Sequence, residues 1–262
     1  MAFYICFEGT DGVGKTTQIE LLSNYLKSQN FKVLQTKEPG TPLVPSTMRL
    51  RSLMLDLSYE KNPESLLIEL ESLKSEKFND FALNLINQAI SEISINKSLT
   101  ILSREYIAQT IRSIHLNELI LPAIDHYDFI IQDRGVFSGL SYGVNCGFNR
   151  ADLEVLIDKN ISNSFIKGKS LNSLYDMVIY LDGDPEISLK KAKSAKKEYA
   201  LGDAMEEKGN EFIKKVGLTF RELLKNKKNT SYISVYSHKK FKDKNQIFNE
   251  ILNEVRKIKK DI

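Results

Sequence analysis

The chain has 262 residues, of which 42% are hydrophobic and 27% are charged. These fractions are typical of soluble globular proteins and exclude a largely disordered or fibrous chain. The 37 basic and 34 acidic residues leave a net charge of +3, too small an imbalance to indicate nucleic-acid binding. The apolar runs are too short to span a bilayer, and no signal segment precedes the first predicted strand, so we expect a cytoplasmic protein with no membrane partner. With only two cysteines, we expect no disulfide framework, and Cys6 should be a small buried side chain.

Short apolar runs alternate with segments of helical spacing along the chain. In chain order, the runs predict strands at residues 3–8, 32–36, 129–132, 177–181 and 232–235. The first run is followed by Ile19, Leu22 and Leu26 at helical spacing, and further helices are predicted over residues 47–57, 64–95 and 103–124. This alternation favours an α/β fold with a five-stranded parallel sheet and helices on both faces.

Two segments differ in composition from the rest of the chain. Residues 58–98 are rich in Ser, Glu, Asn and Lys with interleaved Leu and Ile, which predicts one or two helices in an insertion after the second strand. Residues 190–208 are dense in lysine, with five between Lys190 and Lys197. A charge run of this kind is ordinarily a solvated helix face. We expect one domain that contains both segments.

A glycine-rich loop follows the first predicted strand. The sequence GTDGVGKT at residues 9–16 fits the phosphate-binding pattern G-x-x-x-x-G-K-[ST] at every fixed position. The glycines allow backbone N–H groups to turn toward phosphate oxygens, and the helix that follows adds its positive end. Lys15 would contact the β and γ phosphates, and the Thr16 hydroxyl would ligate Mg²⁺. The alternative is a glycine turn with no ligand.

Asp133 and Arg134 follow the third predicted strand directly. They therefore lie at the carboxyl end of a strand, where open α/β sheets bind their ligands. A structural ion pair is one interpretation. Because the phosphate-binding loop is present, we favour Asp133 near Mg²⁺ and Arg134 on a second phosphate, which its guanidinium can bind through two parallel hydrogen bonds.

Six ordered motifs together resemble those of the thymidylate kinases, a family of P-loop nucleoside monophosphate kinases. EGTDGVGKTT at residues 8–17 resembles the family's E-G-x-D-G-x-G-K-T-T, and KEPGT at 37–41 resembles R-E-P-G-G-T. LRSLMLD at 50–56 resembles L-R-x-L-L-L-D, and Arg112 followed by ILPAI at 120–124 resembles an arginine followed by I-x-P-A-L. DRGVFSGLSY at 133–142 and YLDGDPE at 180–186 resemble D-R-Y-x-x-S-x-x-A-Y and Y-L-D-x-x-P-E. The resemblance spans most of the chain except residues 58–98.

This resemblance implies a P-loop NTPase fold and ATP-dependent phosphorylation of a deoxynucleoside 5′-monophosphate. The expected substrate is dTMP or a related pyrimidine nucleotide, including a 5-modified one, and the expected cofactors are ATP and Mg²⁺. Asp11 would accept a hydrogen bond from the sugar 3′-hydroxyl, Arg51 and Arg134 would hold the substrate phosphate, and Arg112 would reach the base. Asp133 would organise the metal and its water shell. The family generally pairs through helices near residues 58–98, so a homodimer is expected.

The resemblance also assigns the remaining site residues. The loop that binds ATP would comprise Asp11, Gly12, Val13, Gly14, Lys15, Thr16 and Thr17, and the substrate side would add Glu38, Pro39, Ser138 and Tyr142. Residues 234–239 would lie beside the adenine, and residues 190–208 would form a lid. Relatives supply a catalytic arginine from the loop or the lid, whereas here neither has one, so Lys196 and Lys197 are expected to substitute in catalysis.

Three positions near the expected base pocket depart from the family. Ala108 replaces the aromatic residue that stacks on thymine, Gly135 replaces the tyrosine of D-R-Y, and Gly143 replaces a frequent glutamine. Such losses indicate either a pocket widened for another base or an enzyme that has lost catalysis. Because the phosphate and metal groups are all retained, we expect catalysis. The alternative is a catalytically silent nucleotide-binding protein that uses residues 58–98 as an interaction surface, while a DNA-acting ATPase is disfavoured by the balanced charge.

Overall fold

A computed structural model of the chain describes every residue except 56–61, 165–167, 185–186, 189–207, 238–239 and 261. Its centre is a five-stranded sheet in the order β2-β3-β1-β4-β5, and all neighbouring strands are parallel. The strands are β1 (Phe3–Glu8), β2 (Val33–Lys37), β3 (Phe129–Asp133), β4 (Met177–Asp182) and β5 (Thr230–Ser234). The predicted parallel sheet is thus confirmed, with strand ends shifted by at most two residues. The structure adds a short antiparallel pair that the sequence did not predict, β6 (Tyr236–Ser237) and β7 (Lys240–Phe241).

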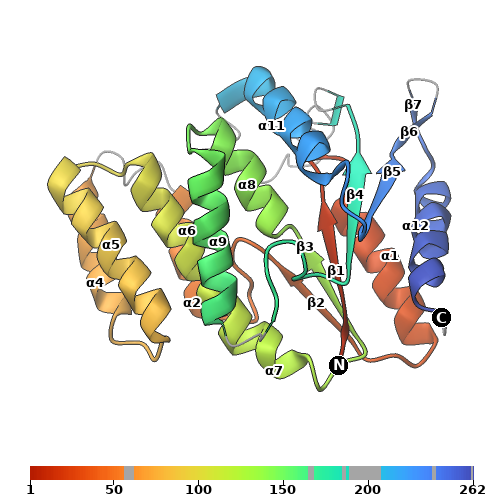
Figure 1. The fold of residues 1–262 in the computed structure, drawn as a ribbon, viewed down its shortest axis with the longest axis horizontal. Coiled ribbons are helices and arrows are strands. Elements are labelled where there is room, and N and C mark those ends of the chain that lie inside the picture. The colour runs from red at the N-terminus through yellow and green to blue at the C-terminus, as the bar shows by residue number, and fades with distance from the viewer. Residues whose placement is uncertain (56–61, 165–167, 185–186, 189–207, 238–239, 261) are drawn as a thin grey trace.

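Alternate residues of the strands pack on opposite faces of the sheet, as the two-residue period of a strand requires. Ile5 and Phe7 of β1 belong to a core shared with α1 (Lys15–Ser28) and α12 (Lys244–Ile258). Tyr4 and Cys6 belong to a second core, shared with α8 (Val136–Asn145), α9 (Arg150–Asn163) and α11 (Gly209–Leu224). Figure 1 shows α1 and α12 on one side of the sheet and α8 and α9 on the other. The structure therefore has the predicted helices on both faces, and Cys6 is fully buried as expected.

A third core lies away from the sheet, among α2 (Pro45–Leu55), α4 (Pro63–Leu73), α5 (Asp80–Asn96) and α6 (Ile101–His115). Figure 1 shows α4 and α5 at the end of the molecule farthest from α12. The sequence predicted one or two helices here, and the structure has two. α4 ends at Leu73, and the side chain of Asn79 caps α5 by accepting from the Ala82 N–H at 2.8 Å. The buried leucines and isoleucines of both helices pack against α2 and α6 of the same chain.

The helix predicted over residues 103–124 is also divided. α6 continues into one π-helical turn, η1 (Leu116–Ile120), and then into α7 (Leu121–Ala123). None of the helices in the described ranges has the length and hydrophobicity needed to cross a membrane.

The strand order fixes where a ligand site can form. β1 lies between β3 and β4, and the chain adds β2 and β3 on one side of it and β4 and β5 on the other. Open α/β sheets bind ligands in the crevice beyond the carboxyl ends of the strands at such a switch point. The loop after β1, which carries the phosphate-binding motif, therefore begins at the centre of that crevice.

The third core provides a test of the packing of α4. Leu70 is fully buried, whereas Ile68 on the same helix is 70% exposed. Leu70→Ala should lower the free energy of unfolding by roughly 2–5 kcal/mol because it leaves a cavity between α4 and its neighbours. Ile68→Ala should change it by no more than about 0.5 kcal/mol. Urea denaturation followed by circular dichroism measures both, and equal effects of the two variants would contradict this placement of α4.

Candidate nucleotide-binding site

The phosphate-binding loop leaves the end of β1 and enters α1. Gly9 has a φ of +139°, and a Cβ at this position would lie 2.6 Å from the Leu181 carbonyl oxygen, so only glycine fits. The Lys15 ammonium donates to the carbonyl oxygens of Gly9 at 3.1 Å and Thr10 at 3.0 Å. Burial, and then the neighbouring Arg134, lower the pKa of Lys15. The loop thus holds a buried positive charge beside the amino end of α1, where phosphate oxygens are favoured.

Thr16 and Asp133 bring two oxygen groups together at the ends of β1 and β3. Thr16 Oγ1 lies 3.5 Å from Asp133 Oδ2. Asp133 Oδ1 is buried and has no hydrogen-bond partner among the described residues. An orphaned carboxylate oxygen next to a hydroxyl is a suitable donor set for Mg²⁺, which binds proteins through one or two carboxylates and completes its shell with water and phosphate. The predicted metal residues are therefore adjacent, and their chemistry fits that ion.

Arg134 lies across the phosphate-binding loop from Lys15. Its guanidinium donates to Asp11 Oδ1 at 2.7 Å, to the Gly9 carbonyl at 3.1 Å and to Ser138 Oγ at 3.2 Å. The Tyr142 hydroxyl donates to the other oxygen of Asp11 at 3.2 Å. The φ of Arg134 is +64°, an unfavourable conformation for a side chain of this size, and its backbone N–H donates to the Phe7 carbonyl at 2.8 Å. Four predicted substrate residues, Asp11, Arg134, Ser138 and Tyr142, are thus in direct contact.

Glu8 joins this cluster to the sheet. Its carboxylate accepts from the backbone N–H groups of Gly135 and Ser138, each at 3.0 Å, and from the Ser138 hydroxyl. It therefore caps α8, whose own first residues supply no side-chain cap. Burial raises the pKa of Glu8, and the hydrogen bonds from Ser138 oppose that rise. Glu8 had no predicted role, although an acidic residue that ends an apolar strand is a signal for such a contact.

A second buried carboxylate, Glu38, follows β2. It accepts from Arg112 Nε at 3.0 Å and lies 3.1 Å from His115 Nδ1, and the other nitrogen of His115 lies 2.8 Å from the Thr36 hydroxyl. Burial would raise the pKa of Glu38, but Arg112 and His115 outweigh it, and the pKa is lowered. Arg112 Nη1 is buried and has no partner among the described residues. The predicted base-contacting arginine is therefore fixed by Glu38 and keeps a donor free for a ligand.

Arg51 lies on α2, against the loop that follows β2. A Cβ built on Gly40 would lie 3.1 Å from both Cβ and Cδ of Arg51, so the stem of this side chain passes directly over the loop. That loop also carries Glu38 and Pro39. The structure thus brings Arg51 to the same edge of the sheet as the other predicted substrate residues.

At two of the three positions expected to widen the base pocket, neighbouring side chains occupy the room beside the glycine. A Cβ on Gly135 would lie 1.9 Å from the Tyr175 hydroxyl, and one on Gly143 would lie 2.5 Å from Leu153 Cδ2. The space that larger side chains would need is therefore filled by Tyr175 and Leu153. Ala108 is half-buried and packs against the third core. Any widening must come from this position alone.

A third buried carboxylate, Glu105, lies on α6 two turns before Arg112. Gln109 Nε2 donates to its Oε1 at 2.6 Å, and Asn160 of α9 donates to the Gln109 carbonyl at 2.7 Å and to its side-chain oxygen at 2.9 Å. Glu105 Oε2 accepts no hydrogen bond within the part of the chain that the structure describes. Burial raises the pKa of Glu105 from 4.5 to about 7. Glu105 was not predicted as a site residue, because it lies outside every motif.

Some predicted positions remain without a structural account. Residues 190–207 of the expected lid, including Lys196 and Lys197, lie outside the described residues, as do residues 238 and 239 of the stretch expected beside adenine. The described part of that stretch begins at the end of β5, where the Val235 N–H donates to the Asp182 carbonyl at 2.9 Å. Val235 and Val13 both lie within 3.1 Å of a Cβ built on Gly183, so this stretch adjoins the phosphate-binding loop.

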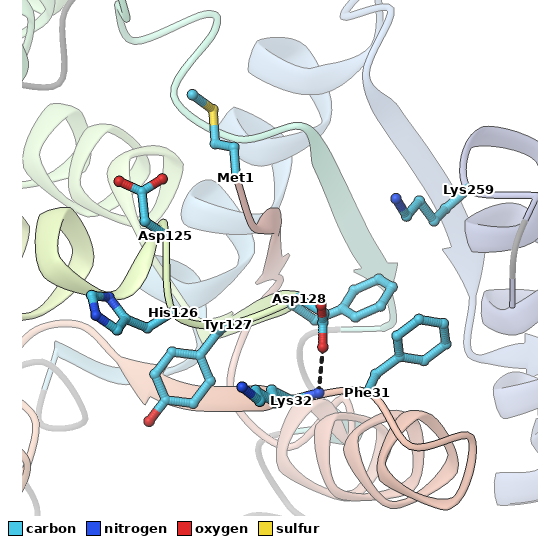
Figure 2. Close-up of a pocket in the computed structure, with 9 residues that line it drawn as sticks. Met1, Phe31, Lys32, Asp125, His126, Tyr127, Asp128 and Lys259 are labelled. Atoms are coloured by element: carbon cyan, nitrogen blue, oxygen red, sulfur yellow. Dashed lines mark hydrogen bonds between the residues drawn. The ribbon is translucent and has the colours of Figure 1, made fainter.

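A separate pocket of about 280 Å³ lies at the opposite, amino-terminal edge of the sheet (Figure 2). Asp128 accepts from the Lys32 N–H at 2.7 Å within it. The pocket contains none of the predicted site residues, and its lining is Met1, Phe31, Lys32, Asp125, His126, Tyr127, Asp128, Phe129 and Lys259.

Comparison with known proteins decides the family. A sequence profile of the thymidylate kinases matches residues 7–72 and 84–247. The chain belongs to the thymidylate kinase family. It is therefore a nucleoside monophosphate kinase, a phosphotransferase, as the motifs implied.

Individual members of the family match over nearly the whole chain. A thymidylate kinase from Prochlorococcus marinus (strain NATL2A) is 31% identical over 263 aligned residues, which cover 98% of both chains. One from Finegoldia magna is 29% identical and covers 88% of each. The crystal structure of thymidylate kinase from Ehrlichia chaffeensis superposes with a TM-score of 0.56 at 21% identity, over 97% of this chain and 98% of that one. This likeness confirms the P-loop α/β fold of the thymidylate kinases.

The raised pKa of Glu105 predicts a specific dependence of stability on pH. The folded protein keeps the proton of Glu105 up to about pH 7, whereas the unfolded chain loses it near 4.5, so this group's contribution to the free energy of unfolding falls as pH rises between those values. Glu105→Gln removes the effect. The free energy of unfolding of the variant, relative to that of wild type, should therefore rise by up to about 3 kcal/mol between pH 4.5 and pH 8. Glu64→Gln on the exposed first turn of α4 is the control, and a Glu105→Gln difference that stays constant with pH would contradict the assignment.

Proposed function

We propose that this thymidylate kinase family member transfers the γ-phosphoryl group of ATP to a pyrimidine deoxynucleoside 5′-monophosphate, with dTMP as the principal substrate. The observation that carries the proposal is the contact between the two halves of the site. Arg134 bonds both the Gly9 carbonyl of the phosphate-binding loop and Asp11, which Tyr142 also contacts. A donor phosphate on the loop and an acceptor phosphate on Arg134 would therefore be neighbours.

In this proposal, catalysis comes from positioning and from charge neutralisation, because phosphoryl transfer requires little covalent help from the protein. Lys15 would leave the loop carbonyls and follow the charge on the transferring group. Thr16 and Asp133 would hold Mg²⁺, which when bound would neutralise charge on the ATP phosphates. Arg134 and Arg51 would orient the acceptor phosphate, and Lys196 and Lys197 would add positive charge from the proposed lid.

The sugar and base contacts support the choice of substrate. Asp11 presents a carboxylate at the expected sugar position, and Arg112 keeps a buried N–H donor for a carbonyl oxygen of the base. Because Tyr175 and Leu153 fill the space beside Gly135 and Gly143, a base of ordinary size fits the pocket better than a 5-modified one, and only Ala108 leaves room for the larger base. A cytoplasmic location, a single domain and a homodimer stay predictions of the same proposal.

Turnover with a panel of monophosphates tests the proposal directly. In a coupled assay of ADP release, wild type should turn over dTMP faster than dUMP, dGMP, 5-hydroxymethyl-dUMP or a ribonucleotide. Lys15→Ala should abolish turnover without unfolding the protein, because no other side chain in the loop replaces the ammonium, while Lys27→Ala at the exposed end of the same helix should not change it. ATP binding without turnover of any monophosphate would favour the catalytically silent alternative, and full turnover in Lys15→Ala would refute the role of the loop.

The metal site has its own test. Asp133→Asn should raise the Mg²⁺ concentration needed for half-maximal turnover by roughly 10–100-fold, because it weakens the only carboxylate next to Thr16 in the described part of the site. Asp125→Asn, in the exposed loop at the other end of β3, should leave the Mg²⁺ dependence unchanged. A Mg²⁺ titration of Asp133→Asn that matches wild type would show that the metal binds elsewhere.

A further inference from the structure

The interface between α6 and α8 holds two long polar side chains that face glycines. Arg112 of α6 lies over Gly139, whose built Cβ would be 2.9 Å from Arg112 Nη2. Glu105 of α6 faces Gly143, whose built Cβ would be 3.7 Å from Glu105 Oε2. Seven residues separate Glu105 and Arg112, so their Cα atoms are about 10 Å apart on one face of the helix. The two side chains therefore lie along the α6–α8 interface, about two helical turns apart.

Each of these two side chains has a hydrogen-bonding atom with no partner among the described residues. Arg112 is 5% exposed and its Nη1 has no partner among the described residues. Glu105 is 8% exposed; Gln109 engages its Oε1, and its Oε2 accepts no hydrogen bond within the described chain. A buried donor normally has a partner, so Arg112 Nη1 indicates a ligand atom that accepts, and Glu105 Oε2, which belongs to a largely buried side chain, suits a ligand atom that donates.

Glu105 has no part in the phosphate or metal chemistry. Two charged or titratable groups interact with Glu105. Arg112, on the same helix, favours the charged form of Glu105. Cys146 follows α8, and burial and the charge of Glu105 both raise the pKa of its thiol. Phe148 and Leu153 close the remaining side, at 3.8 and 2.5 Å from the built Cβ of Gly143. Glu105 Oε2 thus lies 3.7 Å from the position that a Cβ at residue 143 would take, in a buried setting that strengthens hydrogen bonds.

We propose that Glu105 is a specificity-determining residue whose carboxylate accepts a hydrogen bond from the ring N–H of the substrate base, while Arg112 donates to the adjacent carbonyl oxygen. This inference rests on the proposed function, because it takes the base to lie at Arg112. Arginine only donates and a carboxylate only accepts. Thymine and uracil present a carbonyl oxygen next to a ring N–H, which matches this pair. Cytosine presents an amino group next to a bare ring nitrogen. Its amino group, a donor, would face the donor Arg112, and its ring nitrogen, an acceptor, would face the acceptor Glu105.

The test compares substrates that differ at this edge. Glu105→Leu keeps a side chain of similar size and removes both oxygens, and Glu105→Gln keeps one acceptor oxygen. Asn160→Leu disturbs the same buried network from α9, through Gln109 and not through Glu105 itself. For each protein, kcat and KM are measured for dTMP, dUMP and dCMP at pH 8, and calorimetry measures the dissociation constants of the same nucleotides.

A hydrogen bond to the ring N–H predicts a selective loss. Glu105→Leu should lower kcat/KM for dTMP and dUMP by about 10–100-fold, mainly through KM, and should leave kcat/KM for dCMP unchanged or raise it, because the like partner of its ring nitrogen is removed. Glu105→Gln should lie between Glu105→Leu and wild type. Asn160→Leu should lower the unfolding temperature and leave the ratio of dTMP to dCMP unchanged.

Several results would overturn the assignment. Equal losses for all three substrates in Glu105→Leu would make Glu105 a structural residue, as would an unchanged ratio of dTMP to dCMP or a wild type that prefers dCMP. If Glu105→Leu does not fold, the dTMP and dCMP affinities of Glu105→Gln decide between the two roles. If wild type turns over none of these nucleotides, the proposed function fails by itself, and the calorimetric ratio still decides whether Glu105 selects the base.

Discussion

The buried carboxylate of Glu8 connects the two halves of the nucleotide site. It ends the central strand, one residue before the phosphate-binding loop, and binds the first N–H groups of α8. A carboxylate on a helix amino terminus satisfies orphan donors and opposes the positive end of the helix dipole. Since α8 carries Ser138 and Tyr142 and follows Arg134, the position of the acceptor phosphate relative to the loop depends on this contact. Together with the hydrogen bonds from Arg134 to Gly9 and from Tyr142 to Asp11, it holds the loop and α8 in one arrangement.

The fold and the phosphate-binding loop could be predicted from the sequence because their signals are local. Strand periodicity, the G-x-x-x-x-G-K-T spacing and the acidic residue after β3 each depend on neighbours within a few residues. The sequence left open whether residues 58–98 hold one helix or two, because apolar spacing continues across the break before the Asn79 cap of α5. The lysine-rich stretch gave a prediction on composition alone, and it lies outside the described residues.

The buried carboxylates were harder to predict because their partners are distant in the chain. Glu8 binds residues about 130 positions away, and Glu38 binds Arg112 at a separation of 74. Three environments give three different results: burial raises the pKa of Glu8 against hydrogen bonds from α8, Arg112 lowers that of Glu38, and burial raises that of Glu105 to about 7. Whether the pKa of a buried carboxyl group rises or falls depends on which residues contact it in the folded structure. No pattern within one helix or strand contains that information.

Because Tyr175 packs against Gly135, the residues at these two positions, which are distant in the sequence, can be substituted only together. The Tyr175 hydroxyl accepts from the Val136 N–H at 3.1 Å and occupies the place of any side chain at position 135. A substitution at position 135 alone would displace the tyrosine and release the first turn of α8 from it. A paired exchange, with a smaller residue at 175, could restore the fit. Introducing a tyrosine at position 135, as in the D-R-Y motif, should therefore succeed only when both positions change together.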